Sequence, residues 1–362
     1  MFTERIYNFS AGPSMLPEEV LKTAASEMLN YKGTGTSVME MSHRSKDFLA
    51  IFEETKSALK QTLGVPDSHD ILFLQGGATL QFSMIPMNLI SKTGKADYAI
   101  TGNFSKLAAK EAKRYGEINI AADTEDQNNI YIPRQADLRL SGDASYFHYC
   151  DNNTIYGTEW DYVPVTGDVP LVCDMSSNIL SKPIDVSKFG LIYAGAQKNM
   201  APAGLTVVIM DKSLAGHAFD YTPIMLDYKT QIEKDSMHNT PSTYNIYILG
   251  LVLKWIASKG GLAGMAAYNE EKASILYNYL DESALFKGCA KRSARSLMNV
   301  TFVTGDADLD VAFAKEAAAK GLSNLKGHRN VGGMRASIYN AMPMEGMHAL
   351  VAFMKEFEAK HR

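Results

Sequence analysis

Cysteine is scarce in this chain: three residues among 362, without the spacing of a zinc site. Three thiols cannot all pair within one chain, and Cys150 and Cys173 lie inside apolar runs, so we expect buried, reduced thiols and no metal site. No run of 18 apolar residues is present, which argues against a membrane span. The segment from Met1 to Ile6 lacks the apolar stretch of a signal peptide, which favours a cytoplasmic location.

An excess of charge is also missing, because 36 Lys and Arg stand against 40 Asp and Glu, a formal net charge of −4. Such a chain has no global attraction to nucleic acid or to an anionic membrane, so any anion site must be a local basic cluster. Repeats and low-complexity stretches are absent. Because 362 residues exceed the size at which one hydrophobic core keeps growing, we expect two lobes.

Short apolar, β-rich runs alternate with helical patterns through the first 260 residues. This alternation is typical of an α/β fold, with a mainly parallel sheet flanked by helices. The expected strands are residues 71–74, 96–100, 144–149, 170–173, 190–194 and 205–210. The expected helices are residues 46–64, 80–91 and 105–115. Ligands of such sheets bind beyond the carboxyl ends of the strands, so polar residues there are candidates for function.

A smaller α/β pattern follows the helix expected at 243–258, which ends near Gly260 and Gly261. Its expected elements are helix 263–280, strand 297–303, helix 309–320, strand 334–339 and helix 344–360. We therefore assign residues 16–259 to a large domain, and residues 1–15 and 260–362 to a small C-terminal α/β domain.

Asp174 and Lys198 follow two successive expected strands, 24 residues apart (198 − 174 = 24). At neighbouring strand ends they can meet over one small ring. That arrangement is what pyridoxal phosphate (PLP) chemistry requires: a lysine Schiff base and a carboxylate at the pyridinium nitrogen. The two residues alone prove little, because strand ends often carry Asp and Lys.

Other strand ends carry further candidates. The turn Gln75-Gly-Gly-Ala-Thr79 could cradle an anion at a helix N-terminus, or could be a tight turn with a Thr cap. It is neither a GxGxxG fingerprint nor a Walker loop, which weakens the nucleotide interpretation. Phe104 could stack on a flat cofactor or belong to the core. Thr154, in a polar cluster after residues 144–149, could bind a ring hydroxyl or cap a turn.

Basic residues gather at two places, His43 with Arg44, and His328 with Arg329 and Arg335 beside a Gly pair. Arginine binds carboxylate and phosphate through two parallel hydrogen bonds, so the set suggests an anionic small molecule with more than one charged end. The alternative is solvated surface charge. The neighbouring glycines argue against that alternative, because glycine allows a ligand to approach the backbone closely and a solvated surface patch does not need this.

Several motifs together resemble the phosphoserine aminotransferases, class V members of the PLP-dependent fold type I enzymes. The motifs are Asn8-Phe-Ser-Ala-Gly-Pro13, Met41-Ser-His-Arg44, Gln75-Gly-Gly-Ala78, Ala196-Gln-Lys198, His238-Asn-Thr-Pro241 and Gly327-His-Arg329 with Val331-Gly-Gly-Met-Arg335. The resemblance runs from Asn8 to about Pro343. It implies transfer of the amino group of L-glutamate to 3-phosphohydroxypyruvate, giving O-phospho-L-serine and 2-oxoglutarate by a ping-pong mechanism in serine biosynthesis. Some members also accept the related substrate of vitamin B6 synthesis.

The resemblance also implies roles for individual residues. Lys198 is the Schiff-base lysine and proton shuttle, Asp174 holds the pyridinium proton, and Thr154 contacts the ring oxygen or the neighbouring carboxylate. The cofactor phosphate is bound by Ala78, Thr79, Gln197, Asn239 and Thr240. In the family the Asn-Thr pair comes from the partner subunit, which implies a homodimer with shared active sites. Arg335 holds the substrate α-carboxylate, and the distal phosphate or carboxylate falls to His43, Arg44, His328 and Arg329.

Two positions depart from the family pattern, and two other functions compete with it. Phe104 stands where many members carry Trp, and the Gly-Gly-Ala-Thr turn replaces an Arg-containing version found in some members.

Another class V enzyme, such as a cysteine desulfurase or an alanine–glyoxylate-type transaminase, is the nearest alternative. A desulfurase needs a reactive cysteine on a mobile loop. The second alternative is a non-catalytic phosphate-binding protein with the same fold, since fold does not determine function.

Overall fold

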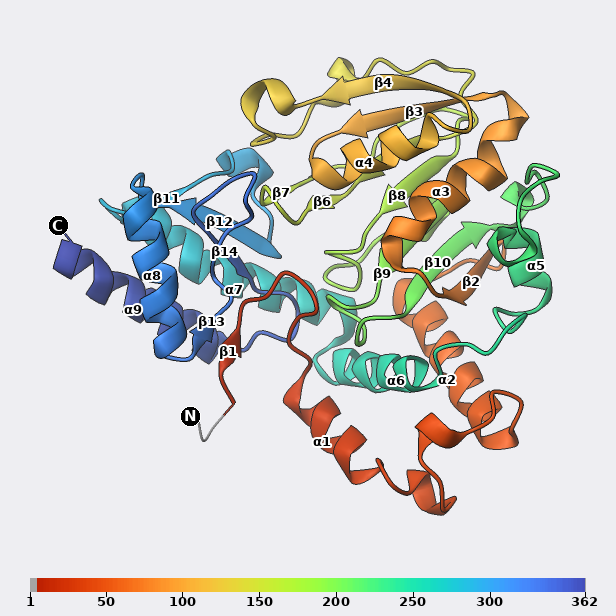
Figure 1. Ribbon diagram of the computed structural model, residues 1–362, viewed down its shortest axis with the longest axis horizontal. Helices are drawn as coiled ribbons and strands as arrows, with labels where there is room; N and C mark the ends of the chain where they lie inside the picture. The colour runs from red at the N-terminus through yellow and green to blue at the C-terminus, as the bar shows by residue number, and fades with distance from the viewer. Residues whose placement is uncertain (1–4, 362) are drawn as a thin grey trace.

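The computed structural model describes residues 5–361, in two lobes built around separate sheets (Figure 1). The large lobe contains a seven-stranded sheet. Its strands, in spatial order, are β2 (His69–Leu74), β10 (Thr206–Asp211), β9 (Leu191–Gly195), β8 (Leu171–Asp174), β5 (Phe147–Cys150), β3 (Lys95–Ile100) and β4 (Glu117–Asp123). The mainly parallel α/β architecture expected from the alternating pattern is confirmed.

One strand of the sheet runs against the others. β10 pairs antiparallel with both β2 and β9, whereas β9, β8, β5, β3 and β4 pair in parallel. The connection from β9 to β10, residues 196–205, contains no helix that could carry the chain back across the sheet. A connection this short returns the chain antiparallel. The carboxyl ends of β2 and β9 consequently lie at the same edge.

Two strands differ from the sequence expectation. The strand expected at 144–149 begins only at Phe147, because the Ser145 hydroxyl accepts from the Thr93 amide and donates to the Ile90 carbonyl, which bends the chain. β4 was not expected at all. It is an edge strand and mostly half-buried, so its sequence lacks the apolar run of a central strand.

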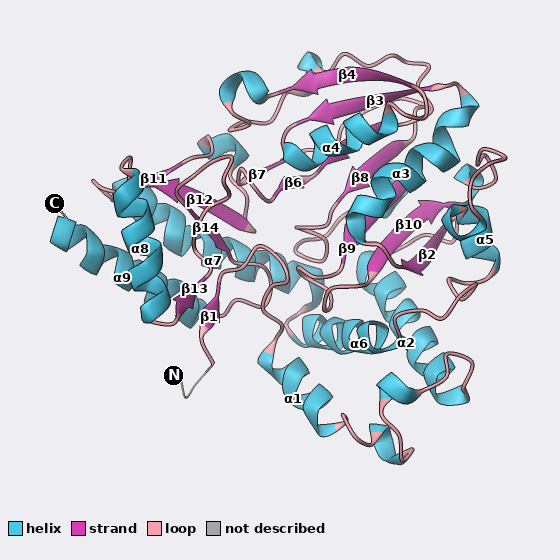
Figure 2. Ribbon diagram, viewed as in Figure 1, coloured by secondary structure: helices cyan, strands magenta, loops and turns pink. Residues whose placement is uncertain are grey.

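Helices cover both faces of the sheet (Figure 2). One face packs against α1 (Glu18–Ser26), α2 (Lys46–Leu63) and α6 (Thr243–Ser258). The other packs against α3 (Gly77–Leu89), α4 (Asn103–Ala112) and α5 (Tyr228–Glu233). Successive side chains of a strand point to opposite faces, so in β2 Ile71 and Phe73 enter the first core and Leu72 and Leu74 the second.

The small lobe combines two short sheets with helices. Its elements are β1 (Tyr7–Asn8), β11 (Lys287–Gly288), β12 (Asn299–Val303), β13 (Leu322–Ser323), β14 (Met334–Ser337), α8 (Ala307–Ala319) and α9 (Met344–His361). The long helix α7 (Gly261–Glu282) joins the lobes: Leu262 and Met265 pack in the large-lobe core, and Leu276 and Leu280 in the small-lobe core.

The first described residues belong spatially to the small lobe. β1 pairs in parallel with β13, and Phe9 and Met15 pack in the small-lobe core. This placement supports the predicted division at residues 15/16 and 259/260. The division itself stays a prediction, and residues 1–4 lie outside the described part.

Short elements complete the chain. A two-stranded hairpin is made by β6 (Asn152–Asn153) and β7 (Thr158–Glu159). Single turns of 3₁₀ helix are η1 (Tyr31–Gly33), η2 (Val38–Glu40), η3 (Ile90–Lys92), η4 (Glu125–Gln127), η5 (Gln135–Asp137), η6 (Val186–Lys188), η7 (Lys212–Leu214), η8 (Ile224–Leu226) and η9 (Arg292–Ala294).

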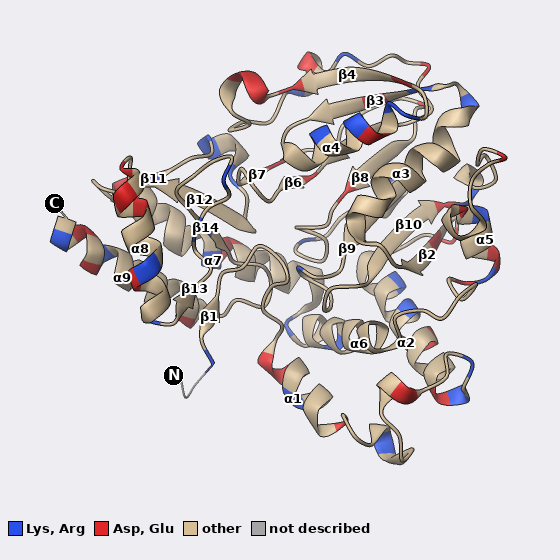
Figure 3. Ribbon diagram, viewed as in Figure 1, with Lys and Arg blue, Asp and Glu red and all other residues tan. Residues whose placement is uncertain are grey.

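Charge and hydropathy follow the sequence expectation. Acidic and basic residues are interspersed along outer helices such as α4, α8 and α9 (Figure 3). Within residues 5–361, no single helix has the length and apolar character to cross a membrane. Helices α6 and α7 have that length and character only when they are counted as one segment, and a bend of 79° separates them.

Candidate active site

Asp174 and Lys198 lie on adjacent strands, as the sequence predicts. Asp174 ends β8, and Lys198 lies in the turn that follows β9. The two strands pair in parallel, with Asp174 opposite Tyr193, so their carboxyl ends share one edge. Both side chains line a cavity of about 340 Å³, a volume in the range of small-molecule sites.

The same cavity collects most of the predicted site residues. Those that line it are Ala78, Thr79, Phe104, Thr154, Asp174, Gln197, Lys198, His328 and Arg335. They come from the ends of β2, β3, β5, β8 and β9, and from the small lobe on either side of the turn before β14. The cavity therefore lies where the two lobes meet.

The Lys198 amine is held near the middle of this set. Its Nζ donates to Thr154 Oγ1 at 2.7 Å and lies 5.7 Å from the centre of the Phe104 ring. Burial lowers the pKa of Lys198 to about 8, and Arg335 adds to this effect, whereas the Asp174 carboxylate opposes it. At pH 8 about half of a lysine with this pKa is the nucleophilic neutral amine, whereas an unperturbed lysine is almost fully protonated there.

The Asp174 carboxylate is fixed by its own strand end and by β5. Oδ1 accepts from the Ser176 amide at 2.9 Å, and the Cys150 thiol lies 3.9 Å from Oδ2. The side chain is buried. Burial and the Asp174 charge raise the pKa of the Cys150 thiol, so this cysteine stays protonated and poorly nucleophilic.

The Gly-Gly turn begins a helix rather than a loop. α3 starts at Gly77, three residues before the expected start, so Ala78 and Thr79 lie in its first turn. Gly76 caps it with φ 91°, a conformation that favours glycine, and a Cβ there would lie 2.4 Å from Leu80 Cδ2. The amides of a first helical turn have no partner within the helix and bind anions. This turn can therefore hold a phosphate.

Arg335 and His328 form the small-lobe side of the cavity. Arg335 Nη1 donates to the Thr154 carbonyl at 3.3 Å, and its buried Nε has no hydrogen-bond partner among the described residues. A buried donor without a partner costs free energy, which an anionic ligand would recover. Burial, Arg335 and Arg329 together lower the pKa of His328, which keeps its imidazole neutral at pH 7.

Five predicted residues lie outside the cavity. His43 and Arg44 occupy the turn before α2, where His43 is buried and Arg44 exposed, and Arg329 is exposed. Asn239 Nδ2 donates to Gln75 Oε1 at 3.3 Å, and Gln75 Nε2 donates to the Thr240 carbonyl at 3.0 Å. These contacts hold the Asn-Thr pair beside the start of α3. The roles of all five stay predictions.

Eleven other residues line the cavity, and the sequence assigned none of them an individual role, although Gly77, Cys150, Asn152 and Asn153 belong to motifs named as candidates. They are Ala11, Gly12, Gly77, Phe82, Asn103, Cys150, Asn152, Asn153, Ile155, Ser176 and Ser177. Ser176 and Ser177 directly follow Asp174, so proximity to a strand end was an available signal. Ala11 and Gly12 come from the N-terminal segment, and only a tertiary contact brings them here: the Ser14 amide donates to the Gln197 carbonyl at 3.0 Å.

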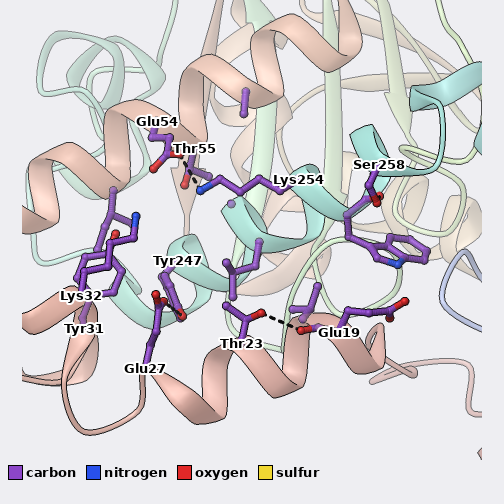
Figure 4. A pocket seen from close by; sticks show the side chains of 16 residues that line it. Glu19, Thr23, Glu27, Tyr31, Lys32, Glu54, Thr55, Tyr247, Lys254 and Ser258 are labelled. Atoms are coloured by element: carbon purple, nitrogen blue, oxygen red, sulfur yellow. Dashed lines mark hydrogen bonds and ion pairs between the residues drawn. The ribbon is translucent and has the colours of Figure 1, made fainter.

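Two further cavities hold none of the predicted residues. One, of about 440 Å³, lies between α1, α2 and α6; in it Lys254 pairs with Glu54 and Tyr247 donates to Glu27 (Figure 4). The other, of about 650 Å³, lies between the lobes near Trp255 and Tyr268. Both exceed the strand-end cavity in volume, so chemistry and not size identifies the active site.

The sequence profile of the aminotransferase class-V family matches residues 6–350, and the chain belongs to this family. Its relatives include phosphoserine aminotransferases of Nitrosomonas europaea, 54% identical, and Pseudomonas putida, 52% identical, with 99% of both chains covered in each case. The solved phosphoserine aminotransferase of Bacillus circulans subsp. alkalophilus superposes with a TM-score of 0.97 at 44% identity, covering 99% of this chain and 100% of that one. A PLP-bound phosphoserine aminotransferase of Trichomonas vaginalis gives 0.93 at 43% identity, covering 97% and 100%.

These similarities confirm the resemblance stated from the motifs. The chain is a PLP-dependent aminotransferase of fold type I. The cavity residues suit that cofactor: an anion-binding helix start for the phosphate, a buried carboxylate for the ring nitrogen, and an amine of lowered pKa for the aldehyde. The alanine–glyoxylate aminotransferase of a Nostoc species, at 16% identity, shares the fold alone.

The lowered pKa of Lys198 predicts how the rate of PLP binding to the cofactor-free protein depends on pH. Only the neutral amine captures an aldehyde, and its fraction increases about tenfold per pH unit up to the pKa. The rate of PLP capture, followed by visible absorption, should therefore rise with pH and level off near 8. A rate that still rises above pH 10 would contradict the burial effect. Lys229, an exposed lysine, can be changed to Ala as the control and should leave the profile unchanged.

Proposed function

We propose that the chain transfers the amino group of L-glutamate to 3-phosphohydroxypyruvate, giving O-phospho-L-serine and 2-oxoglutarate. The observation that carries this proposal is the placement of Arg335 and His328 across the same cavity from Lys198 and Asp174. The first pair suits an acid with more than one anionic group, and the second suits PLP chemistry. The full-length similarity to phosphoserine aminotransferases supports the substrate class.

Each residue has a distinct task in this proposal. Bound PLP supplies an electron sink for the negative charge that develops at the substrate α-carbon. Asp174 keeps a proton on the ring nitrogen, because its buried carboxylate is held in place by the Ser176 amide. Lys198 Nζ moves the α-proton, and Thr154 Oγ1 holds that nitrogen in place between transfers.

The anionic ends of the substrate are assigned to basic residues of both lobes: Arg335, His328 and Arg329 of the small lobe, and His43 and Arg44 of the turn before α2 in the large lobe. Arg335 takes the α-carboxylate, using the Nε that lacks a hydrogen-bond partner among residues 5–361. His328, with Arg329, His43 and Arg44, takes the distal phosphate or carboxylate. A neutral imidazole can accept or share a proton with a phosphate dianion, which lets one site serve both glutamate and the phosphorylated acid. Phe104 stacks on the ring, and Ala78, Thr79 and Gln197 bind the cofactor phosphate.

A desulfurase function is disfavoured by the thiols. Cys150 and Cys173 are buried, and burial raises the pKa of each. The Cys289 amide donates to the Thr301 carbonyl, which holds that residue against β12 instead of on a free loop.

The direct test is a pair of half-reactions. Adding L-glutamate to the holoprotein should release 2-oxoglutarate and shift the visible absorption, and 3-phosphohydroxypyruvate should then restore the spectrum and yield phosphoserine. A holoprotein that reacts with L-alanine and not with glutamate would refute the proposal. The cytoplasmic location stays a prediction.

Lys198→Ala should abolish turnover, since no other cavity amine can move the α-proton, while the protein stays folded and dimeric. The measurements are the overall transamination rate and the mass in solution. Full activity of the variant without added amine would overturn the role of Lys198.

Arg335→Ala should raise the KM for both the amino donor and the keto acceptor, by about tenfold to a hundredfold for loss of a charge-assisted pair. The steady-state KM for each substrate is the measurement. An increase confined to one substrate would contradict a shared α-carboxylate site.

A homodimer with shared sites is part of the proposal, with Asn239 and Thr240 reaching the partner's cofactor phosphate. Hybrid dimers test it. A Lys198→Ala subunit is inactive, and a subunit carrying Asn239→Ala and Thr240→Ala should bind PLP weakly. Mixed after dissociation and reassociation, the two should recover activity at limiting PLP, because one of the two sites then receives an intact Lys198 and an intact Asn-Thr pair.

The hybrid experiment has two controls. Each variant taken alone through dissociation and reassociation should stay at its own low activity. Absence of recovery in the mixture, with hybrid formation verified by mass, would place the Asn-Thr pair in its own subunit's site, beside Gln75.

A further inference from the structure

Lys272 is a buried lysine that the proposed reaction does not use. It lies in α7 with 0% of its surface exposed. Nζ donates to the carbonyl oxygens of Tyr339 and Asn340, at 3.5 Å for the latter, and lies 4.8 Å from the centre of the Tyr268 ring. Within residues 5–361 it has no carboxylate partner, and burial lowers its pKa well below the usual value. An amine kept in the interior at such a cost suggests a specific task.

The two carbonyls belong to one turn, residues 339–341, directly after β14. Arg335 lies on β14, four residues before Tyr339 (339 − 335 = 4). The turn is continuous with the strand, whose ladder pairs Arg335 with Thr301 of β12, so the turn fixes the carboxyl end of the strand that carries the arginine.

The same turn is attached to the segment that carries the catalytic lysine. The Asn340 amide donates to Asn199 Oδ1 at 3.0 Å, and Asn199 directly follows Lys198. The Asn340 side chain donates to the Leu180 carbonyl at 2.9 Å and accepts from Asn269 at 2.9 Å. Asn199, Asn269 and Asn340 are all buried, so water does not compete for these bonds.

A third attachment runs from the turn to the N-terminal segment. Tyr339 Oη donates to the Ala11 carbonyl at 2.7 Å, and Ala11 lines the active-site cavity. The 339–341 turn thus contacts Ala11, which lines the active-site cavity, and Asn199, which follows Lys198. Lys272 donates to the carbonyls of the same turn from α7, the helix that joins the two lobes (Figure 1).

We propose that Lys272 is a positioning residue for substrate binding: by holding the 339–341 turn it fixes Arg335 relative to Lys198. The two functional groups lie on different lobes, so the position of Arg335 relative to Lys198 depends on contacts that cross between the lobes, and the 339–341 turn makes one of them. This inference rests on the proposed carboxylate role of Arg335.

Lys272→Met tests the inference, since methionine keeps an unbranched, apolar stem and removes the donor. The KM values for glutamate and for the keto acid should both rise about tenfold, with kcat changed less than about threefold, because binding and not proton transfer is impaired. The dissociation constant for PLP, measured by absorption in the absence of substrate, should stay within about twofold, because the cofactor contacts assigned above lie in the large lobe.

Leu276→Ala is the matched control. Leu276 lies four residues further along α7, is fully buried, and packs in the small-lobe core. The Leu276→Ala variant should lower the melting temperature at least as much as Lys272→Met does, yet leave both KM values unchanged. If Leu276→Ala reproduces the KM increase, the effect of Lys272 is general destabilisation and the inference is overturned.

Two more variants make the result decisive. If Lys272→Met does not fold, Asn199→Ala replaces it, because it removes the acceptor of the Asn340 amide and should raise both KM values in the same way; unchanged values would overturn the inference. Arg335→Ala is measured alongside. Should Arg335→Ala raise both KM values while Lys272→Met raises neither, the inference fails and the proposed function stands; should Arg335→Ala raise neither, the proposed function fails first.

Discussion

The parallel pairing of β8 with β9 is the constraint on which the active site depends. Backbone hydrogen bonds fix Asp174 opposite Tyr193, so the carboxylate and the turn with Lys198 emerge at one edge and line the same cavity. A slip of one residue would turn every side chain of β8 to the opposite face. Because Leu171 and Cys173 fill one core and Val172 the other, such a slip would exchange the side chains that pack in the two cores. Core packing therefore favours the register that places Asp174 at the same edge as Lys198.

That edge gives only half of a site. The large lobe supplies an anion-binding helix start, a carboxylate and an amine, which serve a cofactor. The groups suited to the acidic substrate, Arg335 and His328, come from the small lobe. The hydrogen bonds that cross between the lobes, such as Asn340 to Asn199 and Arg335 to Thr154, are consequently part of the binding apparatus and not only of the packing.

Much of this arrangement follows from local sequence signals. The β-rich runs located six of the seven sheet strands, and the residues just after them gave Thr79, Phe104, Thr154, Asp174 and Lys198. The late basic cluster gave His328 and Arg335, and only the family resemblance gave Ala78 and Gln197. Three features lay beyond such signals. The edge strand β4 has a mixed, half-buried pattern. Strand β10 runs antiparallel to β9 because the connection between them contains no crossover helix. The Lys272 contacts depend on a turn 67 residues away in sequence. Periodicity reports only near neighbours, so contacts made by folding across lobes escape it.

The pairing of β1 with β13 bears on how the chain is made. Residues 7 and 322 are partners, yet 315 residues of synthesis separate them (322 − 7 = 315). At ~5–20 residues per second, a ribosome needs roughly 15–60 s to cover that interval. The large-lobe sheet can be completed once β10 has emerged, whereas the segment with Ala11 and Ser14 has no small lobe to join until β13 is made. The order of synthesis thus allows the cofactor side of the site to form before the N-terminal segment closes it.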